Sequence, residues 1–296
     1  MKRMLFIYNP NAGKGILKAK ISDILDIFVK ADYEVVVHPT QCYRDAYQKI
    51  IHMEEGYDIV ACGGGDGTLD EVVTGMMKHS KKHRVPIGYI PAGTTNDFAN
   101  SLHISRDVLK AADAIVHGKT FGCDVGLFND DVFVYVAAFG LFTDVSYQTD
   151  QKLKNALGHV AYVLEGVKRL SNIPSYHIKV TSGDTVIDEE FMIGMITNSK
   201  SVAGFRNIMG KDVKFDDGEF EVTLIKKPKS LIGLQEIITA LLVENFDTKH
   251  MYTFKTGNMI LESQEEIPWT LDGEFGGQHD LVRIINKRRA LEIMVR

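Results

Sequence analysis

The feature that most constrains this chain is a glycine-rich turn between an expected strand and an expected helix. Residues 57–62 have the short apolar character of a buried strand, and residues 69–77 carry apolar side chains at helical spacing. Between them, residues 63–67 read Gly-Gly-Gly-Asp-Gly. Glycine permits positive φ and a close approach of the backbone to a bound group, and a helix start offers N–H groups that suit phosphate.

The aspartate in this turn, Asp66, restricts the interpretation further. A carboxylate beside phosphate is unfavourable unless Mg²⁺ bridges the two, or unless the carboxylate accepts a proton from an attacking hydroxyl. The simpler alternative is a tight turn in which Asp66 or Thr68 is the helix N-cap. One glycine is enough for a cap and four are present, so we favour a phosphate-binding turn.

Composition places the chain among ordinary globular proteins. Its 296 residues leave room for two domains, and the net charge of −5 argues against a general nucleic-acid binder. Cys42, Cys62 and Cys123 have no metal-binding spacing, which favours a reduced, cytoplasmic compartment. The N-terminus does not resemble a signal peptide, and the longest uncharged apolar run, residues 132–142, is too short for a membrane-spanning helix.

The first half of the chain alternates between strand and helix patterns. The expected strands cover residues 5–8, 33–38, 57–62 and 86–90, and the expected helices cover 16–30, 45–54 and 69–77. This alternation predicts an α/β domain with a parallel sheet covered on both faces. The loops that follow these strands leave the same edge of the sheet, where such folds bind their ligands.

The pattern changes near Phe121, after which strands follow one another with few helices. Expected strands lie within residues 124–138, around an Asn-Asp turn, and at 176–180, 185–187, 190–196, 220–225 and 258–261. Expected helices cover residues 150–170 and 231–243. We therefore predict an α/β domain over residues 1–123 and a mostly antiparallel β-sandwich or open barrel over residues 124–296. The C-terminal tail could pack back on the first domain.

Five short motifs occur in a fixed order along the chain. They are Asn9-Pro-Asn-Ala-Gly13, Gly63-Gly-Gly-Asp-Gly-Thr68, Pro91-Ala-Gly-Thr-Thr-Asn-Asp-Phe-Ala99, Asp216-Asp-Gly218 and Leu271-Asp-Gly-Glu274. In this order they resemble the diacylglycerol kinase catalytic-domain family, specifically its soluble bacterial lipid kinases. The second motif alone is less specific, since NAD kinases and phosphofructokinases carry close variants. The chain departs from the family at Asp70 and Tyr135, where asparagine is common.

The resemblance implies an active site in a cleft between a nucleotide domain and a lipid domain. The ATP-binding positions it implies are Asn9, Pro10, Asn11, Ala12, Gly13, Thr40, Gly64, Gly65, Asp66, Gly67, Thr68, Leu69, Asp70, Glu71 and Thr94. The catalytic carboxylates it implies are Asp272, Glu274 and Asp66. Backbone N–H groups and threonine hydroxyls in these loops suit a polyphosphate.

The late Asp-Gly-Glu motif supplies the expected proton acceptor for the lipid hydroxyl. Residues 272 and 274 have the spacing that, in an extended segment, places both side chains on one side. One carboxylate could take the proton while the other orients it or holds a metal. The sequence does not apportion these roles.

A structural Mg²⁺ is also implied, with Asp217 as side-chain ligand and the carbonyls of Lys214 and Glu219. The alternative for residues 214–219 is a plain turn, which Asp-Gly alone explains. Both interpretations stay open at this point.

Together these features predict an ATP- and Mg²⁺-dependent lipid kinase that phosphorylates a lipid hydroxyl, with diacylglycerol, which would give phosphatidic acid, as the leading substrate. The alternatives are a soluble-substrate kinase of the NAD kinase type and a non-catalytic nucleotide-binding sensor. Because no spanning segment is expected, the lipid would be reached by peripheral association with the inner membrane surface. Candidate basic contacts lie within residues 78–84, 226–229 and 287–289. A homodimer is compatible with the sequence, and no nucleic-acid partner is expected.

Overall fold

The computed structural model describes residues 1–140, 173–198, 201–202, 205–206, 213–243 and 248–296. The helix expected over residues 150–170 lies outside them. The chain divides into two compact units, Met1–Val125 with Arg288–Arg296, and Gly126–Lys287. The sequence predicted the division after residue 123. The chain passes from one unit to the other within two strands, β5 (Lys119–Phe128) and β15 (Glu274–Val295).

The first unit is built on a parallel sheet, as the alternating pattern predicted. Its strands are β1 (Lys2–Tyr8), β2 (Tyr33–Pro39), β3 (Ile59–Gly64) and β4 (Ile87–Pro91), in the spatial order β2-β1-β3-β4-β15. β1 pairs in parallel with both β2 and β3, and β3 pairs in parallel with β4. The end of β15 adds a fifth parallel strand, with Ile293 opposite Ile87.

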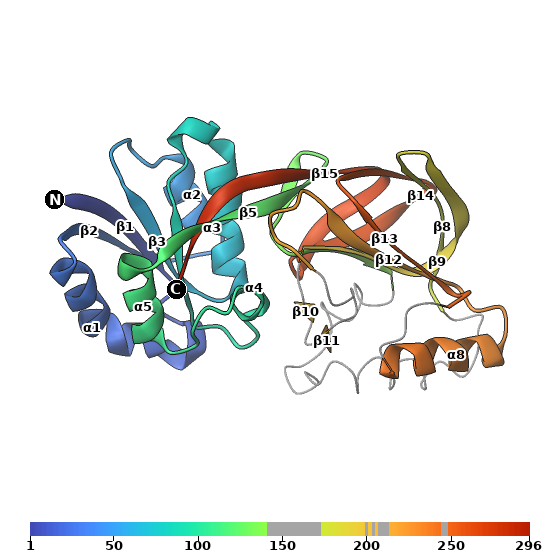
Figure 1. Ribbon diagram of the computed structural model, residues 1–296, viewed down its shortest axis with the longest axis horizontal. Coiled ribbons are helices and arrows are strands. Elements are labelled where there is room, and N and C mark those ends of the chain that lie inside the picture. The colour runs from blue at the N-terminus through green and yellow to red at the C-terminus, as the bar shows by residue number, and fades with distance from the viewer. Residues whose placement is uncertain (141–172, 199–200, 203–204, 207–212, 244–247) are drawn as a thin grey trace. The chain divides into compact units, whose positions relative to one another are not determined.

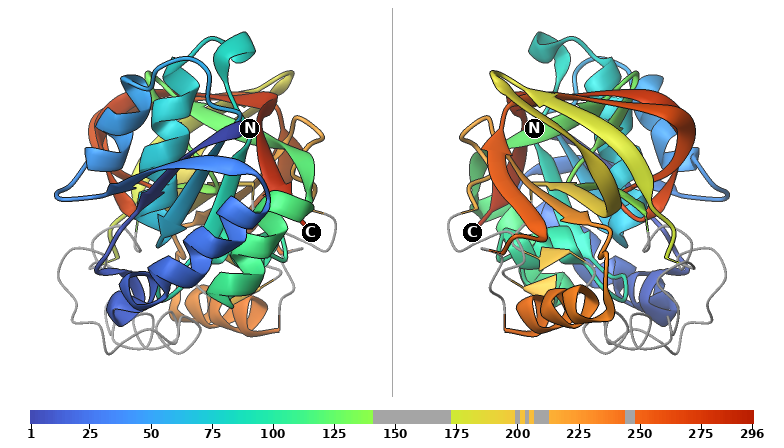
Figure 2. Two further views of the ribbon diagram at one scale, coloured as in Figure 1. Left: turned by 90° about the vertical axis from the view of Figure 1, so that its left-hand side faces the viewer. Right: turned by 90° about the vertical axis from the view of Figure 1, so that its right-hand side faces the viewer.

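Helices cover both faces of this sheet. On one face α1 (Ile16–Lys30) and α5 (Val108–His117) lie side by side, blue and green in Figure 2. On the other, α2 (Asp45–Ile51) packs against α3 (Asp66–Lys78) (Figure 1). The expected apolar face of α3, formed by Leu69, Val72, Val73 and Met76, is buried. Three shorter elements complete the unit: η1 (Ala12–Gly15), η2 (Lys81–His83) and α4 (Asp97–Ser101).

The second unit is mostly antiparallel. Its elements are β6 (Asp131–Phe133), β7 (Val136–Gly140), β8 (Tyr176–Ser182), β9 (Thr185–Thr197), β10 (Ser201–Val202), β11 (Phe205–Arg206), β12 (Phe220–Lys226), α8 (Leu231–Leu242), β13 (Met251–Thr256) and β14 (Asn258–Leu271). One half of β9 pairs with β8 and the other half with β7, and β14 does the same. These pairings close a circuit β8-β9-β7-β14 around one apolar core.

Aromatic side chains fill that core. The Trp269 ring is almost fully buried and meets Phe128 and Phe139 edge-on, with ring centroids 5.0 and 4.8 Å away. Such pairs contribute about 0.5–1.5 kcal/mol beyond the area they bury. β8 and the first half of β14 alternate between buried and exposed residues, whereas β7 and the second half of β9 are buried throughout.

The sequence analysis divided one strand into two and missed two others. Residues 185–187 and 190–196 form one strand, β9 (Thr185–Thr197). Three acidic residues at 188–190 concealed its continuity in the sequence. β13 and the long β15 were not predicted, although Tyr252 and Phe254 alternate with polar residues. Among the described residues, no helix is long and apolar enough to cross a bilayer.

Candidate functional site

Three loops meet at the carboxyl ends of β1, β3 and β4. The loop after β1 is tied to the next by Asn9, whose N–H donates to Gly63 O at 2.8 Å, while its side-chain Oδ1 accepts from Asn11 N at 2.9 Å. Gly13 has φ +57°, and a Cβ there would lie 2.3 Å from Ala92 O. Glycine is therefore required at residue 13 both for its conformation and for the close approach of the third loop.

The central turn differs from the expectation in two details. α3 begins at Asp66 with Gly65 as N-cap and no side-chain cap, so the interpretation of Asp66 or Thr68 as N-cap is wrong. No glycine of residues 63–67 has positive φ. The glycines instead allow close packing, since a Cβ on Gly64 would lie 2.4 Å from Thr68 Oγ1, and one on Gly93 would lie 2.6 Å from Gly65 Cα.

A buried polar network holds the loop after β4 against this turn. The Tyr89 hydroxyl lies 3.2 Å from Gly64 O and 3.4 Å from Asn96 Oδ1. The same Oδ1 accepts from Gly93 N at 2.9 Å, and Asn96 Nδ2 donates to Gly93 O at 2.8 Å. Burial raises the pKa of Tyr89, so its hydroxyl stays protonated and serves as a donor. Neither Tyr89 nor Asn96 was singled out from the sequence.

Asp66 carries the most informative carboxylate of the site. Its Oδ2 accepts from Asp97 N at 3.3 Å, whereas Oδ1 is buried and has no hydrogen-bond partner in the described part of the chain. Burial raises the pKa of Asp66, and the backbone N–H groups of residues 96–98 and the charge of Arg106 oppose that rise. A buried acceptor without a partner is unfavourable unless a ligand supplies one. A divalent cation or a proton fits this oxygen.

Of the other expected ATP positions, Thr40, Gly67 and Thr94 lie in or beside the loops, whereas Leu69 and Glu71 have structural roles. Thr40 begins the loop after β2, where its N–H donates to Tyr8 O at 2.9 Å, and Gly67 and Thr94 are exposed beside the turn. Leu69 is 1% exposed and packs its side chain in the core. The Glu71 carboxylate accepts from the backbone N–H of Arg44 at 2.8 Å and of Ala46 at 3.0 Å, so it caps the start of α2.

The expected catalytic pair occupies a tight turn between β14 and β15. Asp272 has φ +51° and Gly273 has φ +87°, and Leu271 pairs with Glu274 across the turn. Asp272 is 5% exposed while Glu274 is exposed. The prediction that the two carboxylates share one side of an extended segment is therefore wrong, because the left-handed turn separates them.

Backbone donors surround the Asp272 carboxylate. Oδ2 accepts from Val134 N, and Oδ1 accepts from Tyr135 N and Val136 N at 2.9 Å each. The Tyr135 hydroxyl donates to Asp272 O at 3.0 Å. Three N–H groups suit an ionised carboxylate and anchor the turn to residues 134–136.

The segment 214–219 forms a turn in which Gly218 has φ +88°. Asp217 Oδ1 accepts from Glu219 N at 3.1 Å, and its Oδ2 lies 3.9 Å from Lys255 Nζ. An ammonium group therefore already opposes the charge of Asp217. In the described part of the chain, no group of three or more His, Cys, Asp or Glu side chains is arranged to hold a metal. These contacts account for the turn, and the Mg²⁺ at Lys214, Asp217 and Glu219 stays a prediction.

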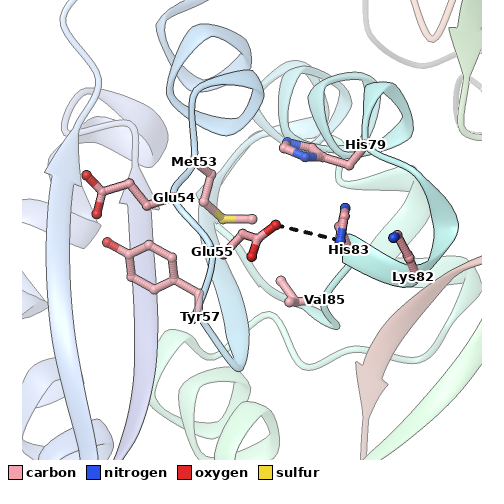
Figure 3. Close-up of a pocket in the computed structure, with 9 residues that line it drawn as sticks. Met53, Glu54, Glu55, Tyr57, His79, Lys82, His83 and Val85 are labelled. Carbon is pink, nitrogen blue, oxygen red and sulfur yellow. Dashed lines mark ion pairs between the residues drawn. The ribbon is translucent and has the colours of Figure 1, made fainter.

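A pocket of about 350 Å³ lies at the opposite, amino-terminal end of the parallel sheet (Figure 3). It is lined by segments that precede β3 and β4, and His83 Nε2 lies 3.6 Å from Glu55 Oε1 at this pocket.

Arg84, one of the candidate membrane contacts, is held by backbone carbonyls of its own chain. Its guanidinium donates to His79 O, Met77 O and Ala290 O at 3.0–3.2 Å, so it ties the C-terminal segment to the sheet.

Known proteins share this sequence and fold. Residues 3–128 match the family model described as diacylglycerol kinase catalytic domain. A curated diacylglycerol kinase from Staphylococcus carnosus (strain TM300) is 34% identical over 294 residues, which cover 99% of this chain and 94% of that protein. One from Bacillus subtilis (strain 168) is 34% identical over 280 residues, covering 94% and 91%.

Solved structures show that the fold is shared as well. A diacylglycerol kinase structure from Bacillus anthracis str. Sterne has a TM-score of 0.76 and 21% identity, covering 100% of this chain and 97% of that one. Another solved chain from this organism reaches a TM-score of 0.84 at 24% identity, covering 100% and 95%. The sequence matches cover nearly the whole chain, and the family model spans the loops that meet around Asp66. The chain belongs to the diacylglycerol kinase catalytic-domain family.

Proposed function

We propose that this protein is an ATP- and Mg²⁺-dependent lipid kinase that transfers the γ-phosphoryl group of ATP to a lipid hydroxyl, with diacylglycerol as the leading substrate. Family membership supports the reaction class. The observation that carries the proposal is the buried Oδ1 of Asp66, which has no hydrogen-bond partner among the described residues. It lies among three glycine-containing loops at the carboxyl ends of parallel strands. That end of an α/β sheet is where nucleotides bind.

The nucleotide's phosphates would lie against residues 9–13, 64–68 and 94. The start of α3 contributes backbone N–H groups and the positive end of the helix dipole. Mg²⁺ would be held first by Asp66, whose unpartnered oxygen fits a hard cation. When bound, the metal would neutralise charge that develops on the phosphoryl oxygens.

Proton removal from the lipid hydroxyl is assigned to the Asp272–Glu274 pair. The Asp272 carboxylate is buried and already accepts three backbone N–H groups, while Glu274 is exposed. We therefore place the proton on Glu274 and give Asp272 the role of holding the turn. Asp66 is the alternative acceptor if neither substitution in the pair affects turnover.

The lipid would be reached at a membrane surface to which the protein binds peripherally. Exposed lysines such as Lys81, Lys82 and Lys229 supply positive charge for an anionic bilayer. Sedimentation with vesicles of increasing anionic lipid content, at low and high salt, tests this part by itself. Binding that responds to neither variable contradicts it.

The decisive experiment is phosphoryl transfer from labelled ATP with Mg²⁺ to a panel of lipids, run beside NAD. Labelled phosphatidic acid, or another phosphorylated lipid, is the expected product. Label in NADP instead would favour a kinase of the NAD kinase type. ATP binding without transfer to any acceptor would favour a nucleotide sensor. The Asp66→Ala variant, which should bind Mg²⁺ and ATP poorly and show no transfer, is the matched negative control.

A further inference from the structure

Arg106 is fixed to the loop that follows β4 by two hydrogen bonds. Its Nε donates to Asn100 Oδ1 at 3.1 Å, and its Nη2 donates to Thr95 O at 3.0 Å. Thr95 adjoins Thr94 on one side and, on the other, the Asn96–Asp97 pair that contacts Tyr89 and Asp66. The guanidinium therefore belongs to the same loop as the candidate nucleotide residues.

The remaining guanidinium nitrogen of Arg106, Nη1, is available to a ligand as far as the described residues show. Within the described residues, Nη1 has no hydrogen-bond partner and Arg106 takes part in no ion pair. The positive charge of Arg106 also acts on Asp66, since it opposes the rise that burial causes in the pKa of the Asp66 carboxyl. A cation thus lies near the candidate phosphate site with one edge held and one edge open.

Bracing the loop does not by itself explain this arrangement. Asn100 Nδ2 already donates to Thr95 O at 3.2 Å, so that carbonyl has a partner without the arginine. The Arg106 side chain is exposed, and ordering a long exposed side chain costs up to about 2 kcal/mol of rotamer entropy. A planar guanidinium held on one edge is instead well suited to take an oxyanion on the other.

We propose that Arg106 is an anion-binding residue of the nucleotide site, which offers Nη1 to an oxygen of the bound polyphosphate while Nε and Nη2 hold the guanidinium on residues 95–100. The inference rests on the proposed use of ATP. A cation already ordered before the nucleotide arrives loses little further entropy on binding. Its charge also offsets the repulsion between phosphate and the Asp66 carboxylate.

The test compares three ligands by calorimetry: ATP, inorganic tripolyphosphate, and adenosine by competition. Arg106→Gln should weaken ATP and tripolyphosphate by about ten- to a hundredfold, the range for one charge-assisted hydrogen bond, and leave adenosine unchanged. Arg106→Lys keeps the charge but loses the fork, so an intermediate loss is expected. The matched control, Lys110→Gln, removes one exposed charge from the neighbouring helix α5 and should leave all three affinities unchanged.

Three results overturn the inference. Arg106→Gln could bind ATP and tripolyphosphate as tightly as the wild type, or it could lose adenosine affinity by the same factor, which indicates a brace for the loop. A wild-type protein that binds no polyphosphate would overturn it as well. An Arg106-dependent affinity for ATP in a protein that phosphorylates no lipid would leave the inference standing and refute the proposed lipid kinase.

Discussion

Gly65 offers a test that separates the needs of the fold from those of a ligand. Its backbone is extended, with φ −87° and ψ −175°, which any L-residue adopts. Among the described residues, a Cβ at this position would meet only Gly93 Cα, at an ordinary contact distance of 3.4 Å. The folded chain therefore does not require glycine at residue 65.

The size of the effect follows from these numbers. Gly65→Ala removes conformational freedom from the unfolded chain and introduces no clash, so unfolding should cost about 0.4–1 kcal/mol more. The melting temperature should rise by up to about 4 °C. The added methyl group stands at the start of α3, where phosphate would approach the backbone. Loss of one charge-assisted N–H bond there should weaken ATP binding by about ten- to a hundredfold.

Thermal unfolding and calorimetric titration with ATP measure the two effects separately. Gly93→Ala is the contrasting variant, because its Cβ would lie 2.6 Å from Gly65 Cα and force the two loops apart. It should lose stability by about 1–3 kcal/mol. If Gly65→Ala binds ATP as tightly as the wild type, phosphate does not approach this backbone and the reasoning is refuted.

Three further predictions concern carboxylates. Asp66→Asn should unfold at a higher temperature than the wild type at alkaline pH, because burial raises the pKa of Asp66 and disfavours its ionised form. The gain should vanish as pH falls below about 3.9, because the wild-type carboxyl then becomes protonated in the unfolded state as well as in the folded state. Glu71→Gln leaves one of two N–H groups at the start of α2 without its acceptor and should cost about 1 kcal/mol in chemical denaturation, with ATP affinity unchanged. Asp272→Asn places an amide N–H group opposite backbone N–H donors, so it should lower the free energy of unfolding by about 1–3 kcal/mol. Glu274→Gln should leave that free energy unchanged. Equal stability of the two variants would contradict the role of Asp272 in holding the turn.

Periodicity was sufficient to predict the parallel sheet and its helices. α1 covers residues 16–30, the range that apolar spacing predicted, because local preference and burial agree there. The loops that converge on Asp66 could also be anticipated, since the ends of parallel strands share one edge. The structural roles of Leu69 and Glu71 were harder to predict. A motif gives the order of residues along the chain and does not show which side chain packs in the core or caps another helix.

Contacts between distant residues were beyond what one sequence shows. The Asp272 carboxylate is held by residues 134–136, more than a hundred positions away, so its burial could not be deduced from Asp-Gly-Glu spacing. β15 escaped prediction for a related reason. Its charged residues at 287–289 interrupt the alternation, and its pairing with β4 joins residues more than two hundred positions apart.

That pairing has a consequence for how the protein is made. β4, whose Tyr89 and Ile90 are almost completely buried, receives its outer neighbour only from residues 288–296. Arg84 likewise finds one of its three acceptors at Ala290. During translation the first 125 residues emerge with an unpaired sheet edge next to the loops that meet around Asp66. The nascent chain can complete that edge only after the ribosome has added residues 288–296, so β4 is a place where a chaperone or a neighbouring chain can compete with this segment.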